Sequence, residues 1–455
     1  MITTKKEFKN TLTGKLKNSY TANGGLFLLC ICVKKITPPT KDIQEKALVR
    51  VVEAFKNYDS LLRWYRTLWL ELFKSTYIFE TERRSEGQST IFFPKCYEQM
   101  EKIAPRLTGN DPKFIIGLNV PINPLDKDAD MIKYAQANQA TLNYFWKLGN
   151  SSAKLRSLAK GGLLYGVMFA KVGFHQKLIE TKEVNESTSE TGELTQKTIK
   201  KEEVLQEYPI FTVPDIFDVY FDPRIEFVDD MSSIIEVETK IRKSDIYGMK
   251  DTYFNLDEIK KLNLGVKNDD YKKTNKFSLQ GVPSMDNKAD DEYLSKKTYY
   301  GYFSETDDIE DEELYKITTI NDSIVIGYEE IKFIPFEKFV PVEIPNQGVG
   351  KGIIEPIKKL QEAYNLTRNQ RFENVSLVLN RMWLMKAGAS IDPRKLVSRA
   401  GNIIMTKDMA ALAPVPTPDV TNSAFSEAQS INTEIQTTLG TIDTTQDSSD
   451  NGFTN

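Results

Sequence analysis

Apolar residues recur every three or four positions over several long stretches in the first third of the chain, which is the spacing of amphipathic helices. The predicted helices span residues 42–58, 61–79, 94–107, 126–146 and 153–160. Pro94 suits the first turn of the third helix, Asp126 is the expected N-cap of the fourth, and Gly161-Gly162 is expected to end the fifth. The wide apolar face of 61–79 predicts a core helix.

The pattern changes to alternation after residue 163, which predicts β-strands. The expected strands span 164–176, 203–208, 209–221 and 233–241, and a shorter one precedes them at 113–118. The first two should pair, with the Thr-, Glu-, Lys- and Ser-rich stretch 181–201 as a solvated hairpin tip or a disordered loop. The first 240 residues or so are therefore predicted to form an α+β body.

The next section is organised differently. A helix is predicted over 244–262, with Ser244 as its N-cap, and a polar loop follows at 267–288. A compact strand module is then expected over 297–303, 314–320, 323–330 and 332–344. Asn321-Asp322 should form a tight turn inside this module.

The longest helical pattern spans 353–382, a rod of roughly 43 Å at about 1.5 Å per residue. Its apolar stripe consists of Ile353, Ile357, Leu360, Tyr364, Val375 and Val378. Its opposite face is expected to carry Lys358, Glu362, Arg368 and Asn369. The glycines of the preceding segment 348–352 (GVGKG) are expected to let the chain turn sharply from the sheet into this helix.

The last part of the sequence alternates short elements with turns. Short strands are predicted at 383–385 and 402–406, a proline-containing linker at 413–419 and an amphipathic helix at 423–439. The end, 441–455, is polar and is expected to be disordered unless a partner docks there.

Composition narrows the possible functions. The 455 residues carry 60 Lys+Arg and 64 Asp+Glu, a net charge of −4, which excludes nucleic-acid wrapping by bulk positive charge. The hydrophobic fraction of 40% supports a real core, and the length leaves room for about two to four domains. The apolar run 26–33 has under half of the ~20 residues that span a bilayer, so it is interpreted as a buried strand and no membrane partner is expected.

Histidine and cysteine, the residues that most often bind metals or act as nucleophiles, are few in this sequence. The single histidine, His175, and the three cysteines, Cys30, Cys32 and Cys96, show no metal-binding spacing. The GVGKG segment departs from a phosphate loop, because Pro345 stands where that motif needs its first glycine and Gly352 where it needs Ser or Thr. No catalytic constellation, metal site or cofactor is therefore predicted.

One loop is strongly acidic, and its carboxylates are Asp307, Asp308, Glu310, Asp311, Glu312 and Glu313. So many like charges repel one another unless they are solvated or neutralised by a partner. A divalent cation is one possible partner, but the loop lacks the residue order of an EF-hand. A solvated tip or an electrostatic docking surface is the preferred interpretation.

An ordered set of motifs resembles the portal, or head-to-tail connector, proteins of tailed bacteriophages, with the podovirus-like branches nearest. The set consists of Phe93-Pro94 with Pro105-Arg106, the run Asp215–Pro223, Arg242-Lys243-Ser244-Asp245, the G-x-G-x-G segment, and a long helix with Gln361 and Asn365 four apart. The likeness covers roughly residues 60–440, and the order of the motifs carries it rather than any single one.

The resemblance implies an α+β portal fold made of a wing, a two-helix stem, an inserted clip and a reduced crown. The wing would be 1–241 and 383–420, the stem 242–263 and 347–382, the clip 264–346, and the crown with a polar tail 421–455. Portals commonly continue with a helical crown, so its shortness here would mean either a reduced crown or a shortened chain.

The resemblance also implies a ring of about twelve copies at one capsid vertex, assembled in the host cytoplasm, through which double-stranded DNA is packaged and ejected. The expected partners are further copies of the chain, terminase, a head–tail adaptor, and the major capsid and scaffolding proteins. The acidic loop would be the docking site for terminase and adaptors. The residues expected to face the DNA are Lys358, Arg368 and Arg371 on the long helix and Arg394, Lys395 and Arg399 in a tunnel loop at 386–401.

A second hypothesis is a metal-dependent nucleic-acid-processing enzyme of the same packaging system. Only the acidic loop supports it, because carboxylates are the ligands that hard divalent cations prefer. A structural channel without catalysis of its own is the preferred prediction.

Overall fold

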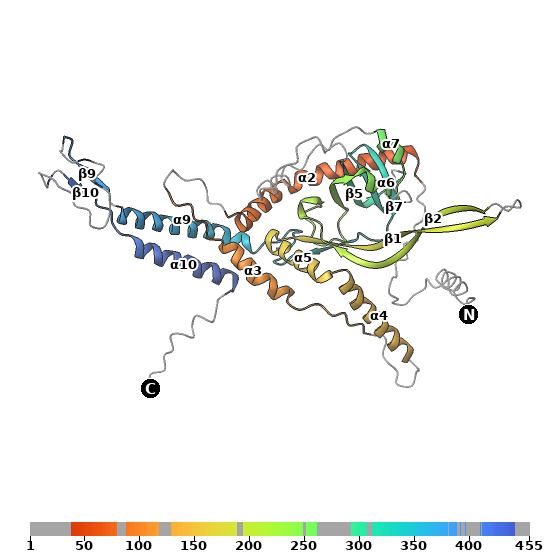
Figure 1. The fold of residues 1–455 in the computed structure, drawn as a ribbon, viewed down its shortest axis with the longest axis horizontal. Helices are drawn as coiled ribbons and strands as arrows, with labels where there is room; N and C mark the ends of the chain where they lie inside the picture. Colours follow the sequence, from red (N-terminus) through yellow and green to blue (C-terminus); the bar gives the residue numbers. More distant parts are fainter. Residues whose placement is uncertain are drawn as a thin grey trace.

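The computed structural model describes residues 38–79, 88–117, 129–188, 194–248, 252–261, 293–306, 312–380, 382–388, 392, 396, 410 and 412–441. The molecule is elongated, with a central body from which a β-hairpin, a helical hairpin and helix α4 (Ala129–Leu148) project (Figure 1). The predictions for 26–33, 267–288, 402–406 and 442–455 lie outside the described residues.

The first two predicted helices form one continuous helix, α2 (Lys41–Tyr77). No proline or glycine interrupts the sequence between them, and the buried residues Val51, Tyr58, Leu62 and Trp69 lie along the same face across the expected break. The prediction of two helices is therefore wrong, because the apolar repeat that defines the face continues through residues 59 and 60.

Helix α2 also contains a buried charged residue, Arg66. The guanidinium of Arg66 donates to the Tyr220 hydroxyl at 2.8 Å and to the Phe217 carbonyl oxygen at 2.9 Å, and it lies 3.8 Å from the centre of the Tyr220 ring. Asp59, two turns earlier on the same side of the helix, accepts from the same group at 3.2 Å. Since the charge is paired and hydrogen-bonded, it fastens α2 to the segment 217–220.

The helix predicted from Pro94 is confirmed as α3 (Lys95–Thr108), whereas the predicted end of α5 (Ser151–Tyr165) is wrong. Gly161 and Gly162 lie inside α5, where a Cβ on Gly162 would overlap the Phe339 ring. These glycines serve close packing of the helix on its neighbours. The helix ends at Gly166, whose φ of +82° is the left-handed conformation of a C-terminal cap.

The sheet strands were mostly predicted, but their grouping was not. An antiparallel sheet has the order β3-β4-β5-β6-β7. Its strands are β3 (Val219–Tyr220), β4 (Ser233–Arg242), β5 (Tyr293–Phe303), β6 (Glu313–Ile320) and β7 (Ile324–Glu330). The strands assigned to a separate module therefore continue the sheet of the N-terminal body, because β4 pairs with β5. The tight turn at Asn321-Asp322 is confirmed, with φ values of 48° and 54°.

A second sheet is built around a long hairpin. Strands β1 (Met168–Thr188) and β2 (Leu194–Thr212) pair antiparallel, which confirms the predicted hairpin but extends both strands far into the expected tip. Strand β8 (Phe336–Phe339) pairs with the first residues of β1, so the fourth strand of the predicted module belongs to this sheet. Residues 113–117 form no strand, and in the predicted strand 209–221 the 3-10 helix η1 (Ile216–Asp218) separates β2 from β3.

The helix predicted over 244–262 is wrong as a single rod. It is replaced by two short helices, α6 (Lys243–Gly248) and α7 (Leu256–Lys261), with non-helical residues 253–255 before the second. The buried side chains Ile246 and Ile259 pack with Leu294 and Ile326 of the five-stranded sheet. This packing explains the break, since a straight helix would carry one of the two isoleucines away from the sheet.

The long helix is confirmed as α9 (Ile354–Leu379), and α10 (Thr421–Leu439) runs beside it as a helical hairpin (Figure 1). At the far end, β9 (Trp383–Met385) pairs antiparallel with β10 (Leu412–Pro414), which takes the first residues of the predicted linker. Within the described residues, no helix is both long enough and apolar enough to cross a membrane.

The glycines before α9 are needed for close packing, and their predicted role in a sharp turn from the sheet into the helix stays a prediction. None of Gly348, Gly350 and Gly352 has a positive φ. A Cβ on Gly350 would overlap the Val342 carbonyl oxygen, and Gly350 itself lies against Gly166 at the end of α5. The segment therefore threads between backbone elements where no side chain fits.

We predict that Gly350→Ala destabilises the protein by at least about 1–3 kcal/mol, because the backbone of residue 342 must move to admit the methyl group. The matched control is Gly117→Ala, where an added Cβ would meet nothing within 4 Å. The unfolding transition of both variants is measured by circular dichroism on heating. Equal midpoints for the two variants would contradict the packing role.

Candidate functional site

Helix α9 carries three of the predicted site residues, Lys358, Arg368 and Arg371, and its sides have different neighbours. One side packs against α10, and another side holds the extended chain before α3. The prediction that Asn369 belongs to an open polar face is wrong, since only 1% of this residue is exposed. It lies against the extended chain, with Gln361 and Asn365 on the same side of the helix.

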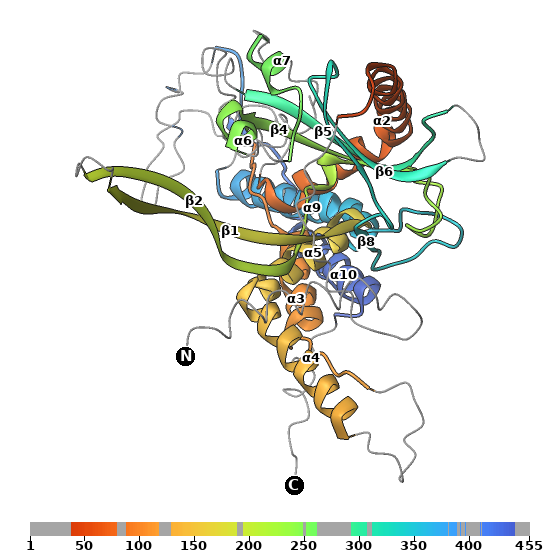
Figure 2. The same ribbon diagram turned by 90° about the vertical axis from the view of Figure 1, so that its right-hand side faces the viewer.

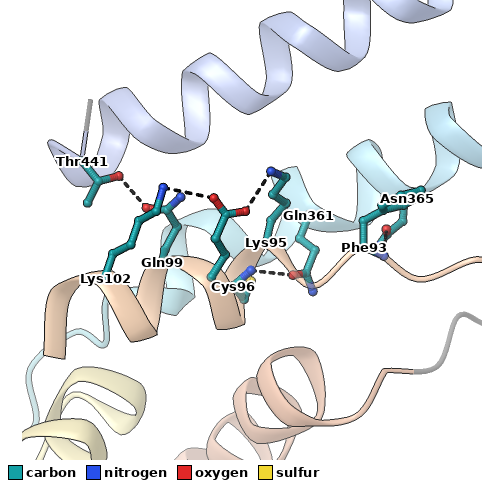
Figure 3. A network of polar contacts seen from close by, with 9 residues as sticks. Phe93, Lys95, Cys96, Gln99, Lys102, Gln361, Asn365 and Thr441 are labelled. Carbon is teal, nitrogen blue, oxygen red and sulfur yellow. Dashed lines mark hydrogen bonds and ion pairs between the residues drawn. The ribbon is translucent and has the colours of Figure 1, made fainter. Parts of the chain in front are cut away.

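These three amides are four residues apart, so they form a line along α9. The Gln361 Oε1 atom accepts from the Cys96 backbone N–H at 2.7 Å, and the Asn365 Oδ1 atom accepts from the Phe93 N–H at 2.8 Å (Figure 3). We call Gln361, Asn365 and Asn369 the amide line.

Asn369 completes the amide line, and both its amide oxygen and its amide nitrogen form hydrogen bonds. Its Oδ1 atom accepts from the Ile91 N–H at 3.0 Å, and its Nδ2 atom donates to the Ile91 carbonyl oxygen at 2.9 Å. One turn further, Glu373 accepts from the Ser89 N–H at 3.1 Å. Side chains of one helix thus satisfy the backbone of residues 89–96, as a neighbouring strand would in a sheet.

The cations predicted to face DNA on α9 make contacts within the chain. Lys358 forms an ion pair with Glu71 of α2 at 2.5 Å. The guanidinium of Arg368 lies 4.9 Å from the centre of the Phe93 ring, and that of Arg371 lies 5.2 Å from the Phe425 ring of α10. These cation–π contacts orient both arginines. Arg368 therefore packs on the extended chain and Arg371 on α10.

Helix α10 is fixed to the rest of the protein at both ends. Near its start, Asn374 of α9 donates to the Pro418 carbonyl oxygen at 3.0 Å and accepts from the Val420 N–H at 3.3 Å. At its end, the buried Thr441 hydroxyl donates to Oε1 of Gln99 on α3 at 2.5 Å (Figure 3). Thr441 thus belongs to the core, although the polar sequence around it predicted otherwise.

The outer half of the helical hairpin exposes apolar side chains. They belong to α9 and to the strand that follows it, and Leu379 has the largest exposed fraction, 66%. We call them the outer apolar residues: Leu366, Leu377, Leu379, Met382 and Leu384. Leu366 and Leu377 are three turns apart on one side of α9, away from the amide line. The sequence alone does not identify this set, because it does not show which side of α9 is covered by α10 and which side stays exposed.

The remaining predicted DNA-facing residues, Arg394, Lys395 and Arg399, lie outside the described residues. Strands β9 and β10 pair Met385 with Leu412, so the two ends of the chain segment between them lie together at the far end of the helical hairpin.

The acidic loop is described only at its borders. Asp307, Asp308, Glu310 and Asp311 lie outside the described residues, while Glu312 and Glu313 are exposed at the start of β6. On the other border, Glu305 accepts from the Tyr328 hydroxyl at 2.7 Å, and the Tyr315 and Tyr328 rings stack with centres 4.7 Å apart. Burial, with the nearby carboxylates of Glu305 and Glu313, raises the pKa of Tyr315, so its hydroxyl keeps its proton.

The remaining candidates for chemistry are the cysteine and histidine side chains. Burial raises the pKa of the Cys96 thiol to about 12, so it is not a reactive thiolate at neutral pH. His175 lies in β1, where Tyr208 of β2 is its register partner. Among the described residues, no three side chains of His, Cys, Asp or Glu come together as a metal-binding group.

We predict that Asn369→Leu lowers the free energy of unfolding, because it removes the hydrogen bonds from the Ile91 N–H and to the Ile91 carbonyl oxygen, each worth about 0.5–1.5 kcal/mol. Urea unfolding followed by tryptophan fluorescence measures the effect. The exposed neighbour provides the control, Gln370→Leu, which should change stability by less than about 0.5 kcal/mol. If N369L is as stable as Q370L, the amide line does not hold the segment.

The family comparison agrees with this arrangement of motifs. The model of the phage SU10 portal protein family matches residues 177–455, which is more than half of the chain. No curated protein matches the chain. The matched family is one of structural, capsid-associated phage proteins rather than of enzymes. The matched range includes the long hairpin from residue 177 onward, the whole five-stranded sheet and the helical hairpin. The chain therefore belongs to the phage SU10 portal protein family.

Proposed function

We propose that this protein forms a homo-oligomeric ring of about twelve copies at one capsid vertex, and that the ring is the channel for DNA packaging and ejection. The observation that carries the proposal is the projecting helical hairpin of α9 and α10, which exposes the outer apolar residues (Figure 1). Contiguous exposed apolar surface in a soluble protein marks an interaction site. In a ring, neighbouring copies would cover it.

The wing, stem and clip boundaries belong to this proposal. The five-stranded sheet joins the proposed wing to the proposed clip through the pairing of β4 with β5, so the two regions would move as one body. The stem would consist mainly of α9, since the first predicted stem region, 242–263, contains only short helices among its described residues. The proposed crown would include α10 and the residues after it.

Contact with DNA is proposed for the six cations named above. Lys358, Arg368 and Arg371 already have partners within the chain, so their charge would act mainly through its field. We therefore assign direct contact to Arg394, Lys395 and Arg399, which lie between β9 and β10 in the sequence. A net charge of −4 suits a channel that must let DNA slide.

Docking of terminase and of the head–tail adaptor is proposed at the acidic loop. Exposed carboxylates attract basic partners from a distance and set the orientation of the encounter. The described borders support this role: Glu312 and Glu313 are exposed, and the stacked tyrosines Tyr315 and Tyr328 next to them offer an aromatic surface. The major capsid and scaffolding proteins would contact the outer surface of the ring.

Native mass spectrometry and negative-stain imaging test the ring directly. Since one chain has a mass of 52.0 kDa, we expect a particle of about 0.6 MDa with a central hole. The matched variant Leu366→Lys/Leu377→Lys should remain folded and lose that mass, because burying two unpaired charges at an interface is unfavourable. Wild-type protein that stays monomeric under all assembly conditions would contradict the proposed function.

The tunnel-loop assignment has its own prediction. Arg394→Gln, Lys395→Gln and Arg399→Gln combined should leave the ring mass unchanged and reduce the DNA packaged or retained per particle, since three cations near the duplex are lost. Complementation of a portal-defective phage, with quantification of DNA in purified heads, measures the effect. The control is Lys359→Gln, whose side chain is 80% exposed on α9. Normal packaging by the triple variant would remove these residues from the channel.

A further inference from the structure

The helical hairpin has two lateral edges that carry opposite charge. Helices α9 and α10 lie side by side in both views of the molecule (Figure 1, Figure 2). Towards the far end Asn374 contacts Pro418, and nearer the body Arg371 contacts Phe425. The two helices are thus antiparallel, and these contacts show which of their residues stand at the same level.

The first edge carries two arginines without a carboxylate partner. Arg368 and Arg371 are three residues apart, so both lie on one side of α9. Their guanidiniums lie against aromatic rings, and neither forms an ion pair or donates a hydrogen bond within the described part of the chain. A guanidinium has five N–H donors. This side of the hairpin, which we call the positive edge, therefore keeps charge and hydrogen-bonding capacity that the chain itself does not use.

The opposite edge carries two carboxylates. Phe425, which contacts Arg371, marks the side of α10 that belongs to the positive edge. Glu427 and Glu434 follow it by two and nine residues, about 200° and 180° around the helix, so both lie on the other side of α10. Both are exposed, and neither forms an ion pair among the residues that the structure describes. We call this side the negative edge.

No cation of the same helix neutralises these carboxylates, since the sequence has no lysine or arginine after Lys407. Glu434 also lines an open groove between the two helices, together with Leu360, Ser430 and Thr437. The groove offers hydroxyl acceptors beside the carboxylate, which suits the several N–H donors of a guanidinium. The negative edge is therefore suited to an arginine that the described part of this chain does not supply.

We infer that the positive edge of one copy binds the negative edge of the next, with the two arginines facing the two glutamates. This inference rests on the proposed ring. A closed ring needs two different and complementary surfaces on every copy, and the two edges of the hairpin meet this condition. DNA would neutralise only the positive edge, whereas a second copy of the chain neutralises both.

The levels of these residues along the hairpin agree with such a contact. Glu427 is two residues from Phe425, a rise of about 3 Å, so it stands close to the level of Arg371. In a stem that runs along the ring axis, rotation from one copy to the next leaves this level unchanged. The side chains of neighbouring copies can therefore meet without a shift of one hairpin along the other.

Charge reversal tests the negative edge. In Glu427→Arg/Glu434→Arg both edges are positive, so we expect loss of the particle of about 0.6 MDa, since like charges now face each other. The variant should stay folded, because both positions are exposed. The matched control is Glu45→Arg/Glu53→Arg, which reverses two exposed glutamates of α2 and should assemble like the wild type. Native mass spectrometry measures assembly, and circular dichroism measures folding.

A mixing experiment shows whether the contact is between copies. Arg368→Glu/Arg371→Glu makes both edges negative, so this variant should also fail to assemble alone. Equal amounts of the two reversed variants should form rings again, with the two kinds of copy alternating, because each reversed edge then meets its opposite. A size tag on one variant lets native mass spectrometry count the copies of each kind. Arg371→Glu alone replaces the double arginine variant if the latter does not fold.

Rings formed by either reversed variant alone, in the same amount as wild type, would overturn the inference, and so would a mixture of folded variants that does not assemble. If the arginine variant forms rings that package less DNA, the arginines serve the DNA and not the neighbouring copy. Wild-type protein separates the two proposals. A wild type that never assembles contradicts the proposed ring, whereas wild-type rings together with unaffected variants contradict the edge contact alone.

Discussion

The fold depends on the amide line of α9. Residues 89–96 have no strand partner, and Gln361, Asn365 and Asn369 supply the hydrogen bonds that their backbone would otherwise lose on burial. The same extended chain links α2 to α3, so one helix face fixes the position of both. Gln361 adds a direct bond to the Ser75 carbonyl oxygen of α2 at 2.8 Å. The bond from the Cys96 N–H to Gln361 is fully buried, so its loss is the costliest of the set.

Close backbone packing completes this frame. Gly350 and Gly166 lie against each other where α5 ends and the chain approaches α9, and the Ile353 N–H donates to the Leu163 carbonyl oxygen at 2.8 Å. The start of α9 is thereby fixed to the helical body, while its far end extends beyond it.

The parts of the molecule that lack internal partners are the parts that an assembly would use. The outer apolar residues and the carboxylates at the start of β6 lie away from the core. The cations of α9 differ, since Arg368 and Arg371 stack on aromatic rings inside the chain. Cation–π contacts of this kind keep a positive charge near a surface without leaving the side chain free.

The sequence alone determined the α+β class, the long helix, the hairpin and the portal-like order of motifs, because periodicity and turn residues act locally. It also indicated Gln361 and Asn365 as a pair, but their partner, the backbone of residues 89–96, appears only in the tertiary structure. Long-range packing decided the rest. Asn369 is buried because the extended chain crosses α9, and the strands assigned to a separate module join β4 because strand pairing depends on neighbours distant in sequence.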